Sequence, residues 1–335
     1  MSELGGKRTL AKTAVRAHKM RVPVGGPREA CHAAISNPLS NAHRISNWEV
    51  VLKLDNPKSK VAIFLVLTLL LSPIGWVLII RAGSFANAGA LLVLMWSPGI
   101  AAILTRLITQ RNLRGQGWVP RTPRLLGLAY VLPPLYALPV YLLAWGSGIG
   151  GFDPSKWMTT PLGGNSPAAA LLLLASGGVL GSVLFAAGEE IGWRGLLVPE
   201  LAKLTSFRNT VLISAGVWAA WHMPVIIGAN YHGEGTPIAF SIACFSAMVL
   251  AISVIAAWIT LKSGSLWPAA LMHASHNLFV QNVFDASMVN RGSAGWLTGE
   301  FGIGLVVAIS IVAWLVYQRS SLIRYASGGP EHTGQ

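Results

Sequence analysis

The chain has 335 residues, of which 53% are hydrophobic and only 11% are charged, whereas soluble domains carry roughly 25% charged residues. This composition argues against a soluble enzyme and favours a protein whose solvent is the lipid bilayer. The formal net charge is +13, but the basic residues lie in short segments between long apolar runs, without the interleaved aromatic residues of a nucleic-acid-binding surface. We therefore predict a membrane protein without a nucleic-acid partner.

The first 60 residues are polar and basic, with eleven Lys or Arg residues against four acidic ones. The first apolar run begins at Val61, which is too far along the chain for the apolar part of a cleavable signal peptide. We predict a cytoplasmic tail over residues 1–60, a transmembrane domain over 61–320 and a second cytoplasmic tail over 321–335.

Eight apolar segments approach the length of about 20 residues that a transmembrane helix needs. They are residues 61–80, 86–107, 125–146, 168–187, 209–229, 237–261, 266–283 and 302–318. We expect an all-α fold, a polytopic membrane helix bundle of about eight transmembrane helices.

The distribution of basic residues predicts the orientation of the bundle. Eight spans place both termini on one side, and the positive-inside rule assigns the side rich in Lys and Arg to the cytoplasm. All 25 Lys and Arg residues except Arg81, Lys156 and Arg291 fall on the side of the termini. We predict an integral membrane protein with both termini in the cytoplasm, in the plasma membrane if the source is prokaryotic.

The sequence GEEIGWR at residues 188–194 places three charges at the predicted cytoplasmic end of the fourth span. Charges in a span are costly, so they usually face the interior of a bundle and mark function. In a helix Glu190 and Arg194 can pair at i,i+4, whereas Glu189 points elsewhere. Trp193 lies four residues after Glu189, where its indole can shield the carboxylate from water. We predict Glu189 as a general base, supported by the Glu190–Arg194 pair.

Two histidine motifs follow on later spans. His273 and Asn277 are four residues apart in the seventh span, so two donors on one face could bind a carbonyl oxygen that becomes negative during attack. His222 in the fifth span could share a water with Glu189 if spans four and five pack together. His276 is the other candidate for the inward histidine, but we interpret it as secondary or structural.

Three further polar residues lie near span ends. We interpret Asn230, His232 and Gln281 as solvated residues in or beside external loops.

The three motifs, in this order on consecutive apolar spans, resemble a known family. Glu189-Glu190-x-x-x-Arg194, an aromatic residue four positions before His222, and His273-x-x-x-Asn277 are similar to the motifs of the CAAX-processing and bacteriocin-processing intramembrane endopeptidases, the CPBP or Abi family. The resemblance covers roughly residues 165–285.

The resemblance implies an eight-helix membrane protease that hydrolyses peptide bonds of a membrane-associated protein or peptide. The implied roles are water activation by Glu189 and His222, oxyanion stabilisation by His273 and Asn277, and support by Glu190 and Arg194. We expect the active site to lie in a cavity open to the cytoplasm. The second motif commonly begins with Phe, and Trp218 stands there instead, which we expect to affect the shape of the pocket more than its chemistry.

A zinc-dependent membrane metallopeptidase is an alternative, because two carboxylates and two or three histidines could bind zinc. The chain has no His-Glu-x-x-His helix signature around these histidines, and Trp193 prevents a Glu-x-x-His pattern. Cys31 and Cys244 lie in dissimilar surroundings and suggest neither a disulfide nor a zinc site. We therefore expect no cofactor.

A non-catalytic membrane scaffold or transporter, similar to bacteriocin-immunity proteins, is the other alternative. Transporters often contain internal repeats with matching broken helices. The first half of this chain has no second copy of the acidic or histidine motifs, which weakens this interpretation.

Overall fold

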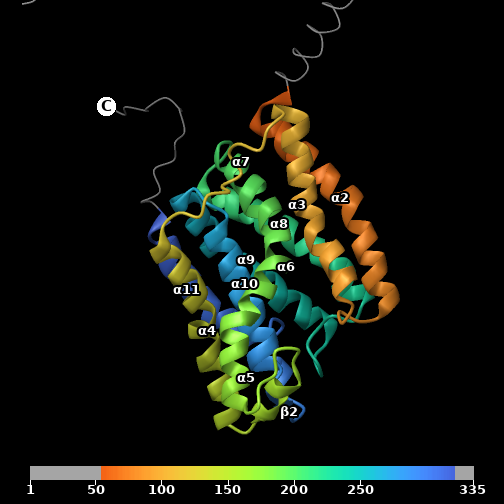
Figure 1. Cartoon of the computed structure of the whole chain (residues 1–335), viewed down its shortest axis with the longest axis vertical. Coiled ribbons are helices and arrows are strands. Elements are labelled where there is room, and N and C mark those ends of the chain that lie inside the picture. Colours follow the sequence, from red (N-terminus) through yellow and green to blue (C-terminus); the bar gives the residue numbers. More distant parts are fainter. Residues whose placement is uncertain (1–53, 321–335) are drawn as a thin grey trace, which may run out of the picture. The chain divides into compact units, whose positions relative to one another are not determined.

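The computed structural model describes residues 54–320, and its regular structure is almost entirely helical (Figure 1). The predicted all-α polytopic fold is confirmed. The predicted tails over 1–60 and 321–335 lie outside the described residues, apart from residues 54–60. The elements are α2 (Pro57–Ala82), α3 (Ala88–Gln110), α4 (Pro123–Gly146), β1 (Gly150–Phe152), η1 (Pro154–Thr159), α5 (Pro167–Leu173), η2 (Leu174–Gly178), α6 (Val179–Gly192), η3 (Trp193–Leu197), α7 (Val198–Ala202), α8 (Phe207–Gly228), α9 (Ile238–Ser263), α10 (Trp267–His276), η4 (Asn277–Asp285), β2 (Met288–Asn290), η5 (Ala294–Trp296) and α11 (Ile303–Tyr317).

Six helices within residues 54–320 are long and apolar enough to cross a bilayer. They are α2, α3, α4, the helix from Pro167 to Ala202, α8 and α9. The other two predicted spans correspond to α10 with its continuation η4, and to α11, which has 15 residues. Helical segments therefore occupy all eight predicted positions.

The fourth span differs from its predicted length. A single helix of 36 residues runs from Pro167 to Ala202, whereas the apolar run predicted an end at residue 187. The acidic motif therefore lies inside a helix and not at its end. The helix continues because its charged side chains find partners within the protein, as described below. Wide π-helical turns interrupt it at Leu174–Gly178 and Trp193–Leu197, and such turns are frequent at functional sites.

Asparagine caps and left-handed glycines explain where several helices begin and end. Asn56 accepts a hydrogen bond from the backbone N–H of Ser59 at 3.0 Å, and Asn87 caps α3 in the same way at 3.1 Å. Such caps satisfy backbone donors that have no partner inside the helix. Gly83 and Gly264 follow α2 and α9 with φ values of 59° and 63°, a left-handed conformation that glycine adopts without strain.

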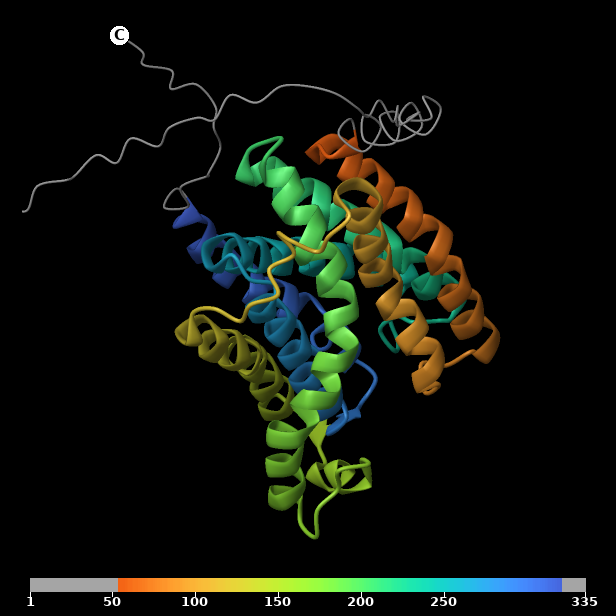
Figure 2. The same ribbon diagram turned by 45° about the horizontal axis from the view of Figure 1, so that its top comes forward.

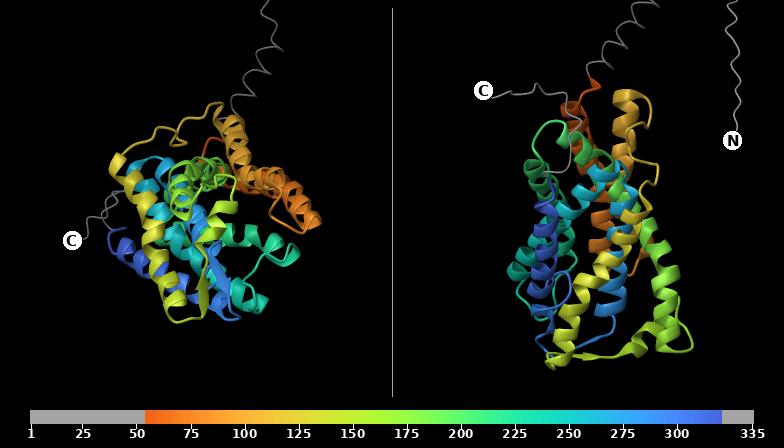
Figure 3. Two further views of the ribbon diagram at one scale, coloured as in Figure 1. Left: turned by 60° about the horizontal axis from the view of Figure 1, so that its bottom comes forward. Right: turned by 90° about the vertical axis from the view of Figure 1, so that its left-hand side faces the viewer.

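The bundle is built around α6 and α10, which pack against each other. On one side α6 contacts α3, and α3 contacts α2; on the other, α10 contacts α4 and α9, and α9 contacts α8 and α11. Figures 2 and 3 show the helices of this arrangement from three further directions. Large aliphatic side chains remain exposed on the outer helices, for example Leu69 and Leu70 of α2 at 64% and 67%. A surface of this kind suits lipid better than water.

The bundle has two different ends, which we name by their features. The basic end contains the beginning of α2, the end of α11 and the connections 111–122, 203–206 and 264–266. The sheet end contains the connections 83–87, 147–166, 229–237 and 286–302. At the sheet end β1 pairs with β2 in antiparallel register, with Gly150 opposite Asn290.

Glycines bring the backbones of α3 and α6 into close contact. A Cβ atom added to Gly99 would lie 2.5 Å from the carbonyl oxygen of Gly188, and one added to Gly192 would lie 2.6 Å from Cβ of Pro98. Small residues four positions apart allow membrane helices to approach in this way. Gly188 and Gly192 flank the acidic pair, so this contact fixes the position of both carboxylates.

We expect Gly192→Ala to lower the free energy of unfolding by about 1–3 kcal/mol, because the added methyl group overlaps Pro98 and pushes α3 away from α6. Thermal unfolding of the purified protein in detergent would measure the change. Gly216→Ala in α8 is the matched control, since a Cβ there meets no described atom within 4 Å outside the helix backbone, and alanine favours helix. Equal melting temperatures for the two variants would contradict the packing argument.

Candidate active site

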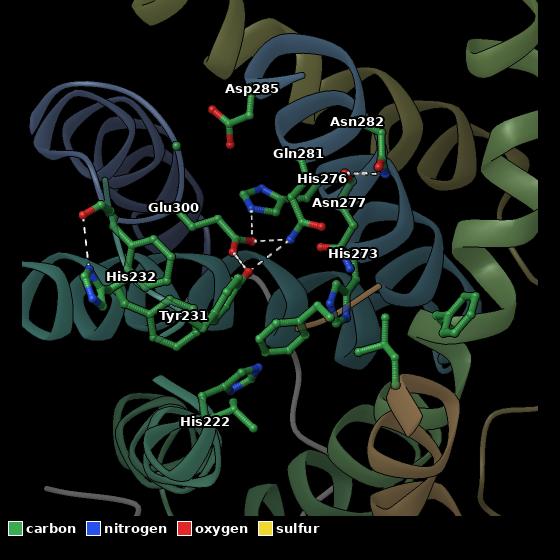
Figure 4. A pocket seen from close by; sticks show the side chains of 18 of the residues that line it. His222, Tyr231, His232, His273, His276, Asn277, Gln281, Asn282, Asp285 and Glu300 are labelled. Atoms are coloured by element: carbon green, nitrogen blue, oxygen red, sulfur yellow. Dashed lines mark hydrogen bonds and ion pairs between the residues drawn. The ribbon is translucent and has the colours of Figure 1, made fainter. Parts of the chain in front are cut away.

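A cavity of about 820 Å³ lies within the bundle, and side chains of α6, α8, α10 and η4 line it. Its lining includes all four residues predicted to take part in catalysis, namely Glu189, His222, His273 and Asn277. Figure 4 shows His222, His273 and Asn277 around this space. Residues from three separate motifs are thus brought to one cavity.

Glu189 is buried, with 2% of its surface exposed, and two indoles hold one of its oxygens. Its Oε2 accepts a hydrogen bond from Nε1 of Trp193 at 3.2 Å and from Nε1 of Trp218 at 2.7 Å. Within residues 54–320 the structure gives no hydrogen bond to the other oxygen, Oε1. Since Glu189 lines the cavity, Oε1 is the oxygen available to a molecule bound there.

Glu190 connects the acidic motif to the third motif. Nη1 of Arg194 donates to its Oε1 at 2.8 Å, which is the predicted i,i+4 pair, and Nδ1 of His273 lies 3.0 Å from the same oxygen. The guanidinium also lies 4.2 Å from the centre of the Trp218 ring, a favourable cation–π distance. The contact with His273 crosses from α6 to α10, and spacing along the sequence did not predict it.

The hydrogen bond of His222 determines which of its nitrogens faces a substrate. Nδ1 lies 2.9 Å from the carbonyl oxygen of Trp218, and a carbonyl oxygen only accepts, so Nδ1 carries the proton. In the neutral ring Nε2 therefore holds a free lone pair. The ring packs against Trp221 and Phe245, with ring centres 4.8 and 4.9 Å away.

Trp218 contacts the other site residues more extensively than its motif position suggested. Its indole N–H binds Glu189, its carbonyl oxygen binds His222, and its ring lies beneath Arg194. Phenylalanine at this position could not donate to the carboxylate. Trp218 therefore contributes a hydrogen bond to this site as well as the shape of its ring.

Asn277 begins the π-helical segment η4 and lines the cavity four residues after His273. Its backbone carbonyl accepts from the side chain of Asn282 at 3.2 Å. Within the described part of the chain the structure gives no hydrogen bond for its side-chain amide. Both side chains of this motif thus border the same space as Glu189.

A second polar network, centred on Glu300, lines the cavity toward the sheet end (Figure 4). Nε2 of His276 lies 3.2 Å from Oε1 of Glu300, and Gln281 donates to the same oxygen at 3.0 Å. The Tyr231 hydroxyl donates to Oε2 at 2.5 Å, and the Tyr136 hydroxyl lies 2.6 Å from Nδ1 of His276. Both ring nitrogens of His276 are therefore engaged within this network.

Glu300 was not predicted as a site residue, although an acid directly before the last apolar segment was a usable signal. It lies between β2 and α11, outside the spans. Burial raises the pKa of this carboxyl, but hydrogen bonds from His276, Tyr231 and Gln281 and the charge on His276 outweigh burial and hold the pKa at about 2. Glu300 is therefore ionised at neutral pH.

Three residues interpreted as solvated loop groups also belong to this lining. Asn230 and His232 lie in the connection 229–237, as that interpretation predicted, whereas Gln281 lies in η4; all three also border the cavity.

The cavity leads to the sheet end of the bundle. Its lining includes Phe85, Glu234 and Asn290, from three connections of that end, and no residue of the described connections at the basic end. The sequence predicted a cavity open to the cytoplasm and, separately, both termini in the cytoplasm. The lining loops and the helix ends at Pro57 and Tyr317 lie at opposite ends of the bundle, so these two predictions do not hold together.

Within residues 54–320 no group of three or more His, Cys, Asp and Glu side chains is arranged to hold a metal ion. Cys244 is buried in α9 as a free thiol, and Cys31 lies outside the described residues.

Comparison with known families supports the motif assignment. Residues 168–279 match the model of a family described as type II CAAX prenyl endopeptidase Rce1-like. The matched segment contains every residue of the three motifs, so the predicted family resemblance is confirmed. A search of curated proteins gave no match.

We expect Arg194→Leu to lower the free energy of unfolding by about 3–5 kcal/mol, because it leaves the Glu190 carboxylate buried without its cation. Lys203→Leu is the matched control: its ammonium also pairs with a buried glutamate, Glu200, at 2.9 Å, but the lysine side chain is 53% exposed. Exposed pairs contribute about 0–1 kcal/mol. Equal losses of stability in detergent would show that burial of the Arg194 pair has no special consequence.

Proposed function

We propose that this chain is an intramembrane endopeptidase that uses water to hydrolyse a peptide bond in a membrane-associated protein or peptide. The family match supports a membrane protease of the CAAX-processing type in general. The observation that carries the specific proposal is the Glu189 carboxylate, held at Oε2 by two indole N–H groups beside a cavity shared with His222, His273 and Asn277.

In the proposed first step, Glu189 and His222 activate a water molecule. Oε1 of Glu189 and the lone pair on Nε2 of His222 both accept hydrogen bonds, so together they can orient the two O–H bonds of one water. The water oxygen forms a bond to the peptide carbonyl carbon as its proton moves to Glu189. Because Trp193 and Trp218 occupy Oε2, the proton goes to Oε1.

The tetrahedral intermediate carries a negative charge on the former carbonyl oxygen, and His273 and Asn277 are the proposed donors to it. Asn277 would donate from its side-chain amide and His273 from Nε2. Since Nδ1 of His273 binds Glu190, an N–H on Nε2 makes the ring a cation, whose charge Glu190 balances. Collapse of the intermediate breaks the C–N bond, and Glu189 returns the proton to the leaving nitrogen.

We also propose that both termini lie in the cytoplasm. Of the Lys and Arg residues between 54 and 320, only Arg81, Lys156 and Arg291 lie in or beside the sheet-end connections. The others lie toward the basic end, which is the side that the positive-inside rule assigns to the cytoplasm.

We expect Glu189→Gln to lower kcat by about 10²–10⁴-fold, because glutamine cannot take a proton from water. The purified protein in liposomes would be incubated with a peptide library, and the products quantified by mass spectrometry. Glu234→Gln, which neutralises another carboxylate of the cavity lining, should retain activity within about twofold. Undiminished hydrolysis by Glu189→Gln would remove the basis of the proposal.

We expect Trp218→Phe to lower kcat roughly tenfold or more with little change in KM. It keeps an aromatic ring but removes a hydrogen bond to a charged group, and such bonds contribute about 1.5–3 kcal/mol. Trp258→Phe is the matched control, since the buried Nε1 of Trp258 has no hydrogen-bond partner in the described residues. The positioning role fails if both variants keep the rate of the unmodified protein.

We propose that hydrolysis needs no metal ion, since the described acids and histidines form no metal-binding cluster and the water can be activated by Glu189 and His222. Dialysis against EDTA and 1,10-phenanthroline should therefore leave kcat unchanged. Loss of activity that stoichiometric zinc restores would favour the metallopeptidase alternative.

A further inference from the structure

The two ends of the bundle differ in the access that they give a peptide to Glu189. The cavity that contains Glu189 continues to the connections 83–87, 229–237 and 286–302 of the sheet end. Polar side chains line it along that route, including Asn277, Gln281 and Asn290. A peptide backbone, which carries obligatory hydrogen-bonding groups, can find partners along this path.

The opposite approach is closed by the connection 111–122. Arg106, with 1% of its surface exposed, donates from α3 to the backbone carbonyls of Arg114, Gly115 and Gly195, each at 3.1 Å. The guanidinium also lies 3.5 Å from Glu200. One buried cation thus ties the connection to the helix that carries the acidic pair.

Further hydrogen bonds tie the same connection to α10. The N–H of Leu266 donates to the carbonyl of Gly117 at 3.1 Å, and the indole of Trp267 donates to the carbonyl of Trp118 at 2.5 Å. Gln116, which is 1% exposed, donates to the carbonyl of Ile191 at 2.5 Å. The connection therefore covers the basic ends of both helices that supply the acidic and His/Asn motifs.

The cavity lining is acidic, whereas the chain as a whole is basic. The lining contains Glu189, Glu234, Asp285 and Glu300 but no Lys or Arg residue, although the chain carries a formal charge of +13. Basic residues concentrate at the other end, where the positive-inside rule places the cytoplasm.

We infer that the peptide enters from the sheet end, that this end faces away from the cytoplasm, and that the substrates are segments of membrane-anchored or exported polypeptides on the extracytoplasmic side. This inference rests on the proposed peptidase function for its substrate class. The inferred direction of entry into the bundle depends only on the cavity and on the closed basic end. Entry from the extracytoplasmic side disfavours C-terminal segments of cytoplasmic proteins as substrates.

Cysteine labelling tests the direction of access without needing catalysis. The parent would be the full chain with Cys31→Ser, keeping the buried Cys244. Gln281→Cys places a thiol in the cavity lining, Arg291→Cys places one on the exposed surface of the sheet end, and Arg121→Cys is the matched control in the basic-end connection. A small membrane-impermeant methanethiosulfonate would be applied to intact cells of a bacterial host, before and after permeabilisation.

The inference predicts modification of Gln281→Cys and Arg291→Cys in intact cells, and of Arg121→Cys only after permeabilisation. The reverse pattern would overturn it. If Gln281→Cys does not accumulate, Asn282→Cys replaces it, since Asn282 is exposed and also borders the cavity.

A cleavage experiment then tests the substrate class. One peptide cut in the library assay would be fused to a single-span anchor on its extracytoplasmic or its cytoplasmic side, and expressed with the unmodified protein or with Glu189→Gln. Cleavage of only the extracytoplasmic reporter is expected, and cleavage of only the cytoplasmic one would overturn the inference. If neither is cut while Gln281→Cys is labelled from outside, the direction of access stands and the peptidase proposal fails.

Discussion

The arrangement of this site depends on how one buried anion, Glu190, is neutralised. Its Oε1 receives Arg194 from the same helix and His273 from α10, at 1% exposure of the glutamate. A buried charge without a partner is strongly destabilising, so these contacts fix the relative position of α6 and α10. The same contacts allow the 36-residue helix to continue through a charged sequence that would otherwise be expected at the membrane surface.

Glu190 binds Arg194 and His273 and thereby holds the helices together, which leaves Glu189 available for the reaction. The glycine contacts between α6 and α3 fix the position of both carboxylates relative to α3. The indole of Trp218 then binds one oxygen of Glu189, and the carbonyl oxygen of Trp218 orients His222. One cavity is therefore lined by two hydrogen-bond acceptors, Glu189 and His222, and by two donors, His273 and Asn277. Preorganised groups of this kind need no rearrangement during the reaction.

The sequence predicted those contacts of the site that depend only on the geometry of a single helix. The Glu190–Arg194 pair follows from i,i+4 spacing, and the family resemblance followed from the order of the motifs. The Trp218–Glu189 hydrogen bond did not, because it depends on how α8 packs against α6. Glu300 was missed for the same reason: its partners come from separate segments. The direction of the cavity also depends on loop positions that hydropathy does not encode.

The most direct test of the proposed mechanism is whether water or the Glu189 carboxylate itself attacks the peptide bond. In a single turnover in H₂¹⁸O with enzyme in excess, attack by water predicts that the new carboxylate of the product carries ¹⁸O and that the peptide containing Glu189 carries none. Mass spectrometry of both species gives the answer. An unlabelled product together with ¹⁸O in Glu189 would mean that Glu189 acts as a nucleophile and not as a base.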